Sequence, residues 1–239
     1  MIAFITSSPF REDVDRPMFS NANGFIDRIR AALPGYPRCL YICSSPDRHD
    51  LNCLFGADVF MAFANAGIHF SSYQVLDNTN ARMASELVKN ADLIVLAGGH
   101  VPTQNAFFRK IGLRELVRNH PGVAMGISAG SMNSADVVYA QPEEPGESCP
   151  EYQRFLPGLG LTTIQVLPHY QKVKDDVLDG LRLYEDITFA DSIGQTFYAI
   201  PDFSYVVSDG CCQTLFGEGY RICDGKLQQV TCHGEALQL

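Results

Sequence analysis

The chain has 239 residues, 46% of them hydrophobic and 19% charged, which is enough to bury a core and argues against long disordered segments. Its net charge is −9, and no basic run is long enough to follow a phosphate backbone, so we expect no nucleic acid partner. No segment reaches the roughly 18 apolar residues of a membrane span, so we expect no membrane partner either.

The length predicts a single domain over residues 1–239. The start of the chain, MIAFITSSPF, has no basic stretch before its apolar run, so we expect a cytoplasmic protein. The cysteines lack paired C-x-x-C spacing and are expected to be reduced thiols. A zinc site is a minor alternative, and its donors would come from Cys211, Cys212, Cys223, Cys232 and His233.

Apolar runs alternate with helical patterns through the first half of the chain. Several runs are apolar on consecutive residues, as in strands that are covered on both faces. The predicted strands are 2–6, 38–44, 72–77, 92–99 and 122–128. Apolar residues at steps of three and four predict helices over 21–33, 51–67, 80–90 and 103–120. This order predicts an α/β fold with a mostly parallel central sheet flanked by helices.

The pattern changes after residue 140. Residues 140–151, AQPEEPGESCPE, predict a polar acidic loop, 161–170 a further strand, and 171–187 a helix. The remainder consists of short apolar runs separated by Gly and Asp turns, which predict C-terminal β-hairpins. The clearest turn is the Asp-Gly pair at 224–225.

The sequence GISAG at 126–130 has the G-x-S-x-G spacing of a nucleophile elbow, in which a serine lies at a sharp turn from a strand to a helix. The context fits, because an apolar strand precedes Ser128 and a helix can begin after it. A plain structural turn is the alternative. We interpret Ser128 as a nucleophile, which needs a base to take its proton and an acid to orient that base.

His169, at the end of the apolar run in VLPHY, is the favoured base, because parallel sheets place their sites at the carboxyl ends of strands. His100, which follows LAGG at the end of another strand, is the rival candidate for the base, and we expect it to line the substrate pocket instead. No role is expected for the other histidines, which are His49, His69, His120 and His233.

The Gly-Gly turn of LAGGH could supply a backbone N–H that binds an oxyanion together with the N–H of Ala129. A plain tight turn is an equal alternative from composition alone. The acid has three candidates: Glu143 and Glu144 lie in the acidic loop, and Asp202 follows another apolar run.

The segments LAGG, GISAG and LPHY, at these separations, resemble the peptidase E and cyanophycinase family, peptidase family S51. That resemblance implies the class I glutamine amidotransferase-like, flavodoxin-like fold. It implies Ser128 as nucleophile, His169 as general base and the Gly99 and Ala129 amides as the oxyanion hole. The peptidase E branch points to Glu143 as the acid, and the cyanophycinase branch points to Asp202. We select Glu143, with Glu144 and Asp202 in reserve.

Two departures from related sequences affect the expected activity. The amidotransferases of this fold carry cysteine at the elbow, so Ser128 argues against glutamine hydrolysis. Peptidase E has GGN where this chain has GGH, and a basic segment after its histidine that is associated with an N-terminal aspartate. Here that segment holds more acids than bases, and its nearest cations are Lys172, Lys174 and Arg182. Strict aspartyl specificity is therefore not expected.

We predict a serine peptidase that hydrolyses short peptides through an acyl-enzyme, with dipeptides bearing an N-terminal acidic residue as one option. The alternative enzyme is an esterase or acyl hydrolase, and the alternative that is not an enzyme is an amidotransferase-like binding module. The expected partner is a small peptide substrate. No metal and no organic cofactor are expected, and a homodimer is left open.

Overall fold

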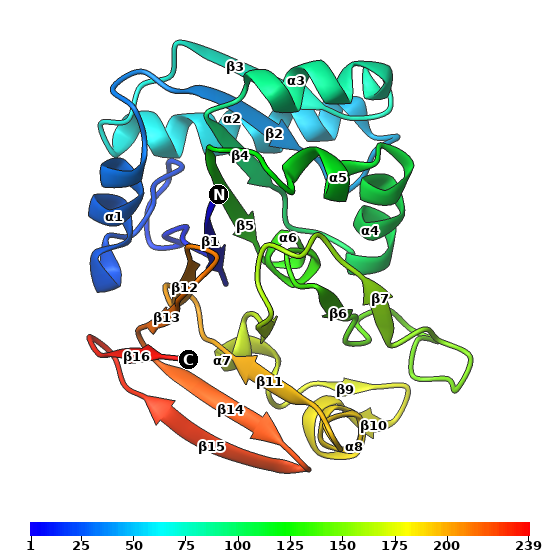
Figure 1. The fold of residues 1–239 in the computed structure, drawn as a ribbon. Coiled ribbons are helices and arrows are strands. Elements are labelled where there is room, and N and C mark those ends of the chain that lie inside the picture. The colour runs from blue at the N-terminus through cyan, green and yellow to red at the C-terminus, as the bar shows by residue number, and fades with distance from the viewer.

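The computed structural model describes all 239 residues, and its main sheet has the strand order β16-β13-β12-β1-β5-β4-β2-β3 (Figure 1). Five strands are mutually parallel: β1 (Ile2–Thr6), β5 (Val123–Ile127), β4 (Leu93–Leu96), β2 (Arg38–Ile42) and β3 (Ser72–Leu76). Antiparallel strands extend the sheet beyond β1: β12 (Tyr205–Ser208), β13 (Gln213–Phe216) and β16 (Ala236–Gln238). The predicted α/β architecture with a mostly parallel sheet is confirmed.

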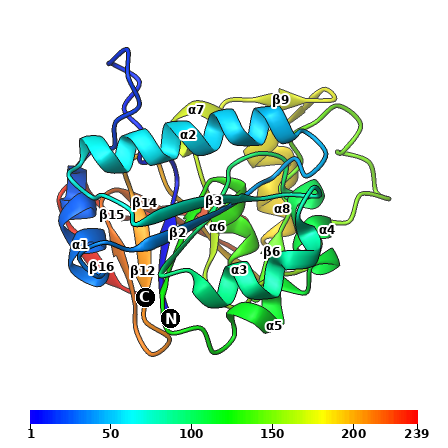
Figure 2. The same cartoon turned by 90° about the horizontal axis from the view of Figure 1, so that it is seen from above.

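Helices cover both faces of this sheet, which explains why the central strands are apolar on consecutive residues. Every residue of β4 and β5 is buried. Helix α2 lies over one face, and α3, α4 and α5 lie over the other (Figure 2). The helices are α1 (Phe25–Ala32), α2 (His49–Asn65), α3 (Ala84–Asn90), α4 (Val101–Lys110) and α5 (Leu113–Val117), with short 3-10 turns at Ala22–Gly24 and Ala81–Met83. None of the helices is both long and apolar enough to cross a bilayer.

The helix predicted over 103–120 is two helices in the structure. Gly112 separates α4 from α5 and adopts a left-handed conformation with φ 64°. A right-handed helix cannot continue through that conformation, so the chain turns at this point.

A second sheet lies below the first in Figure 1, with the order β15-β14-β11-β8. Its strands are β8 (Gln165–Leu167), β11 (Thr196–Ala199), β14 (Gly219–Cys223) and β15 (Lys226–Thr231). The predicted Asp-Gly turn joins β14 to β15, with positive φ at both Asp224 and Gly225, so this C-terminal hairpin is confirmed. A separate hairpin pairs β6 (Val137–Tyr139) with β7 (Phe155–Pro157).

The prediction of a single helix over 171–187 is wrong. Asp179 and Gly180 both have positive φ and form a tight turn, with the same Asp-Gly sequence as the turn at 224–225. The segment contains α7 (Tyr170–Val173), the hairpin strands β9 (Val177–Leu178) and β10 (Leu181–Arg182), a π-helical turn (Leu183–Thr188) and α8 (Phe189–Asp191). The strand predicted over 161–170 is also shorter, because only β8 is extended there.

Candidate active site

Ser128 lies at a strained turn between β5 and the short helix α6 (Ala129–Asn133), with φ 51° and ψ −113°. The flanking glycines are required by close packing. A Cβ on Gly130 would lie 2.2 Å from the carbonyl oxygen of Leu96, and one on Gly126 would lie 2.7 Å from the backbone of Ser131. The G-x-S-x-G pattern therefore marks an elbow in which helix and strand leave no room for flanking side chains.

The elbow is tied to the end of β1. The N–H of Ser128 donates to the carbonyl oxygens of Thr6 and Ser7, at 3.2 and 3.0 Å. The hydroxyl of Ser131 donates to the Thr6 carbonyl at 2.7 Å. These bonds fix the backbone that carries the Ser128 hydroxyl.

His169 follows β8 and also has a positive φ, of 58°. Its Nδ1 lies 2.8 Å from Oδ1 of Asp202. An ionised carboxylate can only accept, so Nδ1 carries a proton, and Nε2 has a free lone pair whenever the ring is uncharged. The N–H of His169 donates to the Ser7 hydroxyl at 2.7 Å, which fixes the main chain at this residue.

Asp202 is held by a dense set of donors. Its side chain is only 9% exposed, and it accepts hydrogen bonds from His169, the Ser7 hydroxyl at 2.8 Å and the Gln171 amide at 2.6 Å. Lys172 Nζ lies 3.0 Å from Oδ2. Burial by itself would raise the pKa of Asp202, but its hydrogen bond to His169 and the charge of that ring, with Ser7 and Lys172, hold the pKa well below its ordinary value.

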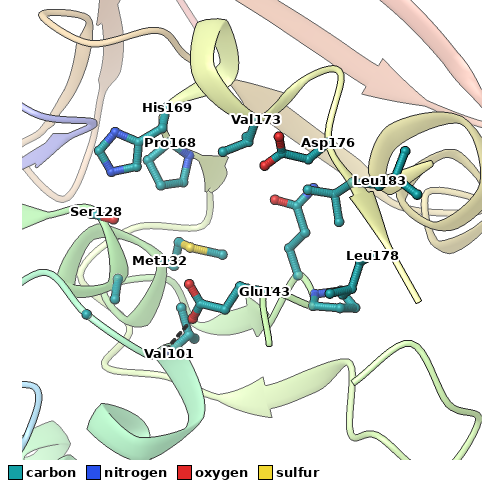
Figure 3. Close-up of a pocket in the computed structure, with 15 residues that line it drawn as sticks. Val101, Ser128, Met132, Glu143, Pro168, His169, Val173, Asp176, Leu178 and Leu183 are labelled. Atoms are coloured by element: carbon teal, nitrogen blue, oxygen red, sulfur yellow. Dashed lines mark hydrogen bonds between the residues drawn. The ribbon is translucent and has the colours of Figure 1, made fainter. Parts of the chain in front are cut away.

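Glu143 was the favoured acid, and the structure corrects this prediction because Asp202, a reserve candidate, is the carboxylate paired with His169. The carboxylate of Glu143 instead accepts a hydrogen bond of 3.2 Å from the N–H of Val101, across the pocket from His169 (Figure 3). The acidic loop packs against the start of α4 rather than against β8. Glu144 is exposed, and its N–H donates to Glu147 at 3.0 Å.

His100 does not line the pocket as predicted but holds the acidic loop. Its Nε2 lies 2.8 Å from Glu147, and its Nδ1 lies 2.7 Å from the Thr103 hydroxyl. Glu147 also accepts the N–H of Glu143 at 2.9 Å, so this pair positions the loop that carries Glu143.

Ligand atoms of His100, Glu144 and Glu147 lie within 4.8 Å of one another, and this is the only group of three such donors. The cysteines and the histidine named above as zinc candidates do not assemble, and every cysteine is a free thiol. Among the remaining histidines, His120 is buried with both ring nitrogens hydrogen-bonded to backbone, whereas His49 pairs with Asp77.

A cavity of about 230 Å³ lies beside Ser128 (Figure 3). Ser128 and His169 both line it, without a direct hydrogen bond between them, and so do Gly99 and Ala129. The N–H groups of Gly99 and Ala129 donate to no acceptor within the protein, which leaves them free for an oxygen of a bound molecule. The structure therefore brings Ser128, His169 and the amides of Gly99 and Ala129 to one cavity, and it pairs His169 with Asp202 rather than Glu143.

Sequence reasoning assigned no role to three residues that organise this site: Ser7, Gln171 and Glu147. Ser7 contacts all members of the arrangement, since its carbonyl accepts from Ser128 and its hydroxyl contacts His169 and Asp202. Its only sequence signal is its position directly after the first strand, in ITSSP. Gln171 and Glu147 carry no signal of their own.

Two of the solved structures that resemble this chain carry the name peptidase. A peptidase from an acI-B1 Actinobacterium superposes with a TM-score of 0.70 at 18% identity, covering 100% of this chain and 96% of that one. A proposed peptidase E protein from Listeria monocytogenes EGD-e superposes with a TM-score of 0.62 at 14% identity, covering 96% of this chain and 98% of that one. At such identities the likeness shows the fold alone.

The family is shown by sequence. No curated protein matched the chain in the sequence comparison. The model of peptidase family S51 matches residues 18–210, which is most of the chain and includes the elbow, His169 and Asp202. The chain therefore belongs to peptidase family S51, and its activity in broad terms is that of a peptidase.

Proposed function

We propose that this protein is a serine peptidase that hydrolyses short peptides, with Ser128 as nucleophile, His169 as general base and Asp202 as the orienting acid. The observation that carries the proposal is the joint position of the strained elbow, the His169–Asp202 pair and the two unpaired amides on one cavity. The size of that cavity, about 230 Å³, favours small substrates.

In the proposed reaction the carbonyl oxygen of the scissile bond accepts hydrogen bonds from the N–H groups of Gly99 and Ala129. Ser128 Oγ attacks the carbonyl carbon while Nε2 of His169 takes the hydroxyl proton. Asp202 holds Nδ1–H and stabilises the imidazolium. His169 then gives its proton to the leaving amine as the C–N bond breaks, which leaves an ester on Ser128.

Water completes the cycle by the same groups. His169 Nε2 takes a proton from water, the hydroxide attacks the ester carbon, and the proton returns to Ser128 Oγ as the acyl group leaves as a carboxylic acid. The two amides bind the oxyanion in both halves of the reaction.

A fluorophosphonate probe combined with peptide hydrolysis tests this proposal. We expect the probe to label one residue, Ser128, and we expect labelling to disappear in Ser128→Ala and to slow strongly in His169→Gln. Short peptides should be cleaved by the same protein. Labelling at another residue contradicts the assigned nucleophile, and cleavage of aryl esters without any peptide cleavage contradicts the peptidase.

A further inference from the structure

The cavity beside Ser128 combines apolar walls with acidic groups. Its charged lining residues besides His169 are Glu143 and Asp176, and no lysine or arginine lines it. Both carboxylates face the same cavity (Figure 3). The remaining lining includes the amide of Gln141 and a set of apolar side chains, from Val101, Met132, Val173, Val177, Leu178 and Leu183.

Neither carboxylate has a cationic partner within the protein. Glu143 is exposed overall, but its carboxylate accepts only one hydrogen bond, from the N–H of Val101, and the loss of water on its protein-facing side raises its pKa above the ordinary value. Asp176 is exposed at the edge of the cavity and is not part of any of the ion pairs of the chain. Two carboxylates that line one cavity without a cation beside them make it electrostatically complementary to a cationic ligand.

The cations that could have received an acidic substrate are engaged elsewhere. Lys172 pairs with Glu12 and Asp202, Lys174 lies 3.3 Å from Asp175, and Arg182 lies 2.7 Å from Asp186. None of the three lines the cavity. An aspartyl side chain would therefore face two like charges there, an arrangement that disfavours binding.

From this geometry, and resting on the proposed function, we propose that the cavity takes the basic side chain, lysine or arginine, of the residue whose carbonyl Ser128 attacks. The aliphatic stem of such a side chain packs against the apolar walls while its head lies between Glu143 and Asp176. A guanidinium can also bind a carboxylate through two parallel hydrogen bonds. The net charge of −9 adds a general attraction for cationic peptides.

The assignment to the acyl residue follows from the amides. Gly99 and Ala129, which would hold the carbonyl oxygen, line the same cavity as the two acids. The Cα of the acyl residue is one bond from that carbonyl carbon, so its side chain enters this cavity directly.

The test uses arginyl-alanine against citrullyl-alanine, in which a neutral urea replaces the guanidinium at nearly the same shape. We expect kcat/KM to be at least about tenfold higher for the arginyl peptide, the factor that corresponds to ~1.4 kcal/mol. Aspartyl-alanine should be slower than both. Equal rates for the arginyl and citrullyl peptides, or preference for the aspartyl peptide, overturn the inference.

Variants locate the preference in the cavity. Glu143→Gln and Asp176→Asn should each reduce the arginyl-to-citrullyl ratio severalfold, because each removes one charge that faces the basic head. Their chain neighbours Glu144→Gln and Asp175→Asn are the matched controls, since neither residue lines the cavity, and should keep the ratio. An unchanged ratio in both cavity variants contradicts the inference.

A binding measurement separates this inference from the proposed function. Calorimetry with Ser128→Ala should show tighter binding of arginyl-alanine than of citrullyl-alanine. If that preference is found while the wild-type protein cleaves no peptide, the cavity assignment stands and the peptidase proposal fails. If peptides are cleaved without a preference for basic residues, the peptidase proposal stands and the cavity assignment fails.

Discussion

The molecule builds a histidine–aspartate pair twice. His169 Nδ1 lies 2.8 Å from Asp202, and His49 Nδ1 lies 2.7 Å from Asp77. In both pairs the aspartate follows an apolar strand, β11 for Asp202 and β3 for Asp77. Each histidine also lies near a nucleophilic residue type: Cys53 Sγ is 3.6 Å from His49 Nε2, and Ser128 shares a cavity with His169.

The surroundings distinguish the two pairs. Ser128 lies on a strained elbow with two unpaired amides and a cavity beside it. Cys53 lies within α2, one turn after His49, and both side chains are exposed at the surface of the helix. A fixed imidazole alone is thus not a catalytic site. The first pair differs in the strained turn that carries Ser128, the amides that can bind an oxyanion and the space for a substrate.

The sharpest way to test this comparison is to remove each nucleophile. We expect Ser128→Ala to lower peptide hydrolysis by roughly 10⁴-fold or more, because the covalent step is lost. Cys53→Ala, the matched variant at the other pair, should leave kcat/KM unchanged. Initial rates on a cleaved peptide measure both, and a large loss in Cys53→Ala would reverse the assignment of the two pairs.

Removing the acids gives the next largest effect on activity. Asp202→Asn should lower kcat by about 10²–10⁴-fold, since the amide no longer fixes the Nδ1–H tautomer or stabilises the imidazolium. Because the pKa of Asp202 lies well below its ordinary value, the carboxylate stays ionised throughout the working range. Glu143→Gln serves as the comparison. A greater loss of kcat in that variant would restore Glu143 as the acid.

Ser7 is a positioning residue that the second pair lacks. Its hydroxyl accepts the N–H of His169 and donates to Asp202, so Ser7→Ala should lower kcat by about 10- to 100-fold through misplacement of the imidazole. KM should change little, and fluorophosphonate labelling should slow in parallel with kcat. Ser20→Ala, at a serine outside the site, is the control. Equal changes in kcat and KM would indicate a general structural effect instead.

The sequence predicted the main sheet because burial on both faces leaves a direct trace, the consecutive apolar residues of β4 and β5. It failed over 171–187 because the spacing of apolar residues there also fits a helix. The Asp179–Gly180 turn overrides that spacing, since positive φ at both residues favours a hairpin. Local turn chemistry therefore decided the structure of this segment, and Val177 and Leu178 of its hairpin line the cavity.

The placement of Ser128 and His169 on one cavity could be predicted because each follows a strand in a recognisable pattern, whereas the carboxylate beside His169 depends on how two strands pair. β11 lies parallel to β8 with Ala199 opposite Leu167, which brings Asp202 beside His169. One signal was present: both strands continue into proline followed by the site residue, in LPHY and IPDF. That likeness becomes evidence only once the strands are known to be neighbours.

We expect the second pair, His49 and Asp77, to contribute to the stability of the fold and not to peptide hydrolysis. Asp77 has a fully buried side chain that accepts hydrogen bonds from Thr79, Asn52 and His49. Asp77→Asn replaces an acceptor by a donor that faces these groups. It should lower the free energy of unfolding by about 1–3 kcal/mol, which lowers Tm by roughly 2–4 °C per kcal/mol for a chain of this size. Peptide hydrolysis should be retained below the melting range.

The pH dependence of the stability difference between wild type and Asp77→Asn tests whether the charges of Asp77 and His49 cause it. Burial alone would raise the pKa of Asp77, but the hydrogen bonds from Thr79, His49 and Asn52 outweigh it and leave the pKa lowered. Its contribution is therefore present above the unfolded value near 3.9 and is lost as the pH falls through the folded value. The hydrogen bond to Asp77 raises the pKa of His49, whose contribution is present below about pH 6.5 and is lost as the pH rises through the folded value. Thermal melts of wild type and Asp77→Asn should thus differ most between about pH 4 and 6.5. In a His49→Gln background, the stability difference caused by Asp77→Asn should no longer decrease above about pH 6.5. A stability difference that does not vary with pH would show that the charges of Asp77 and His49 contribute nothing to it.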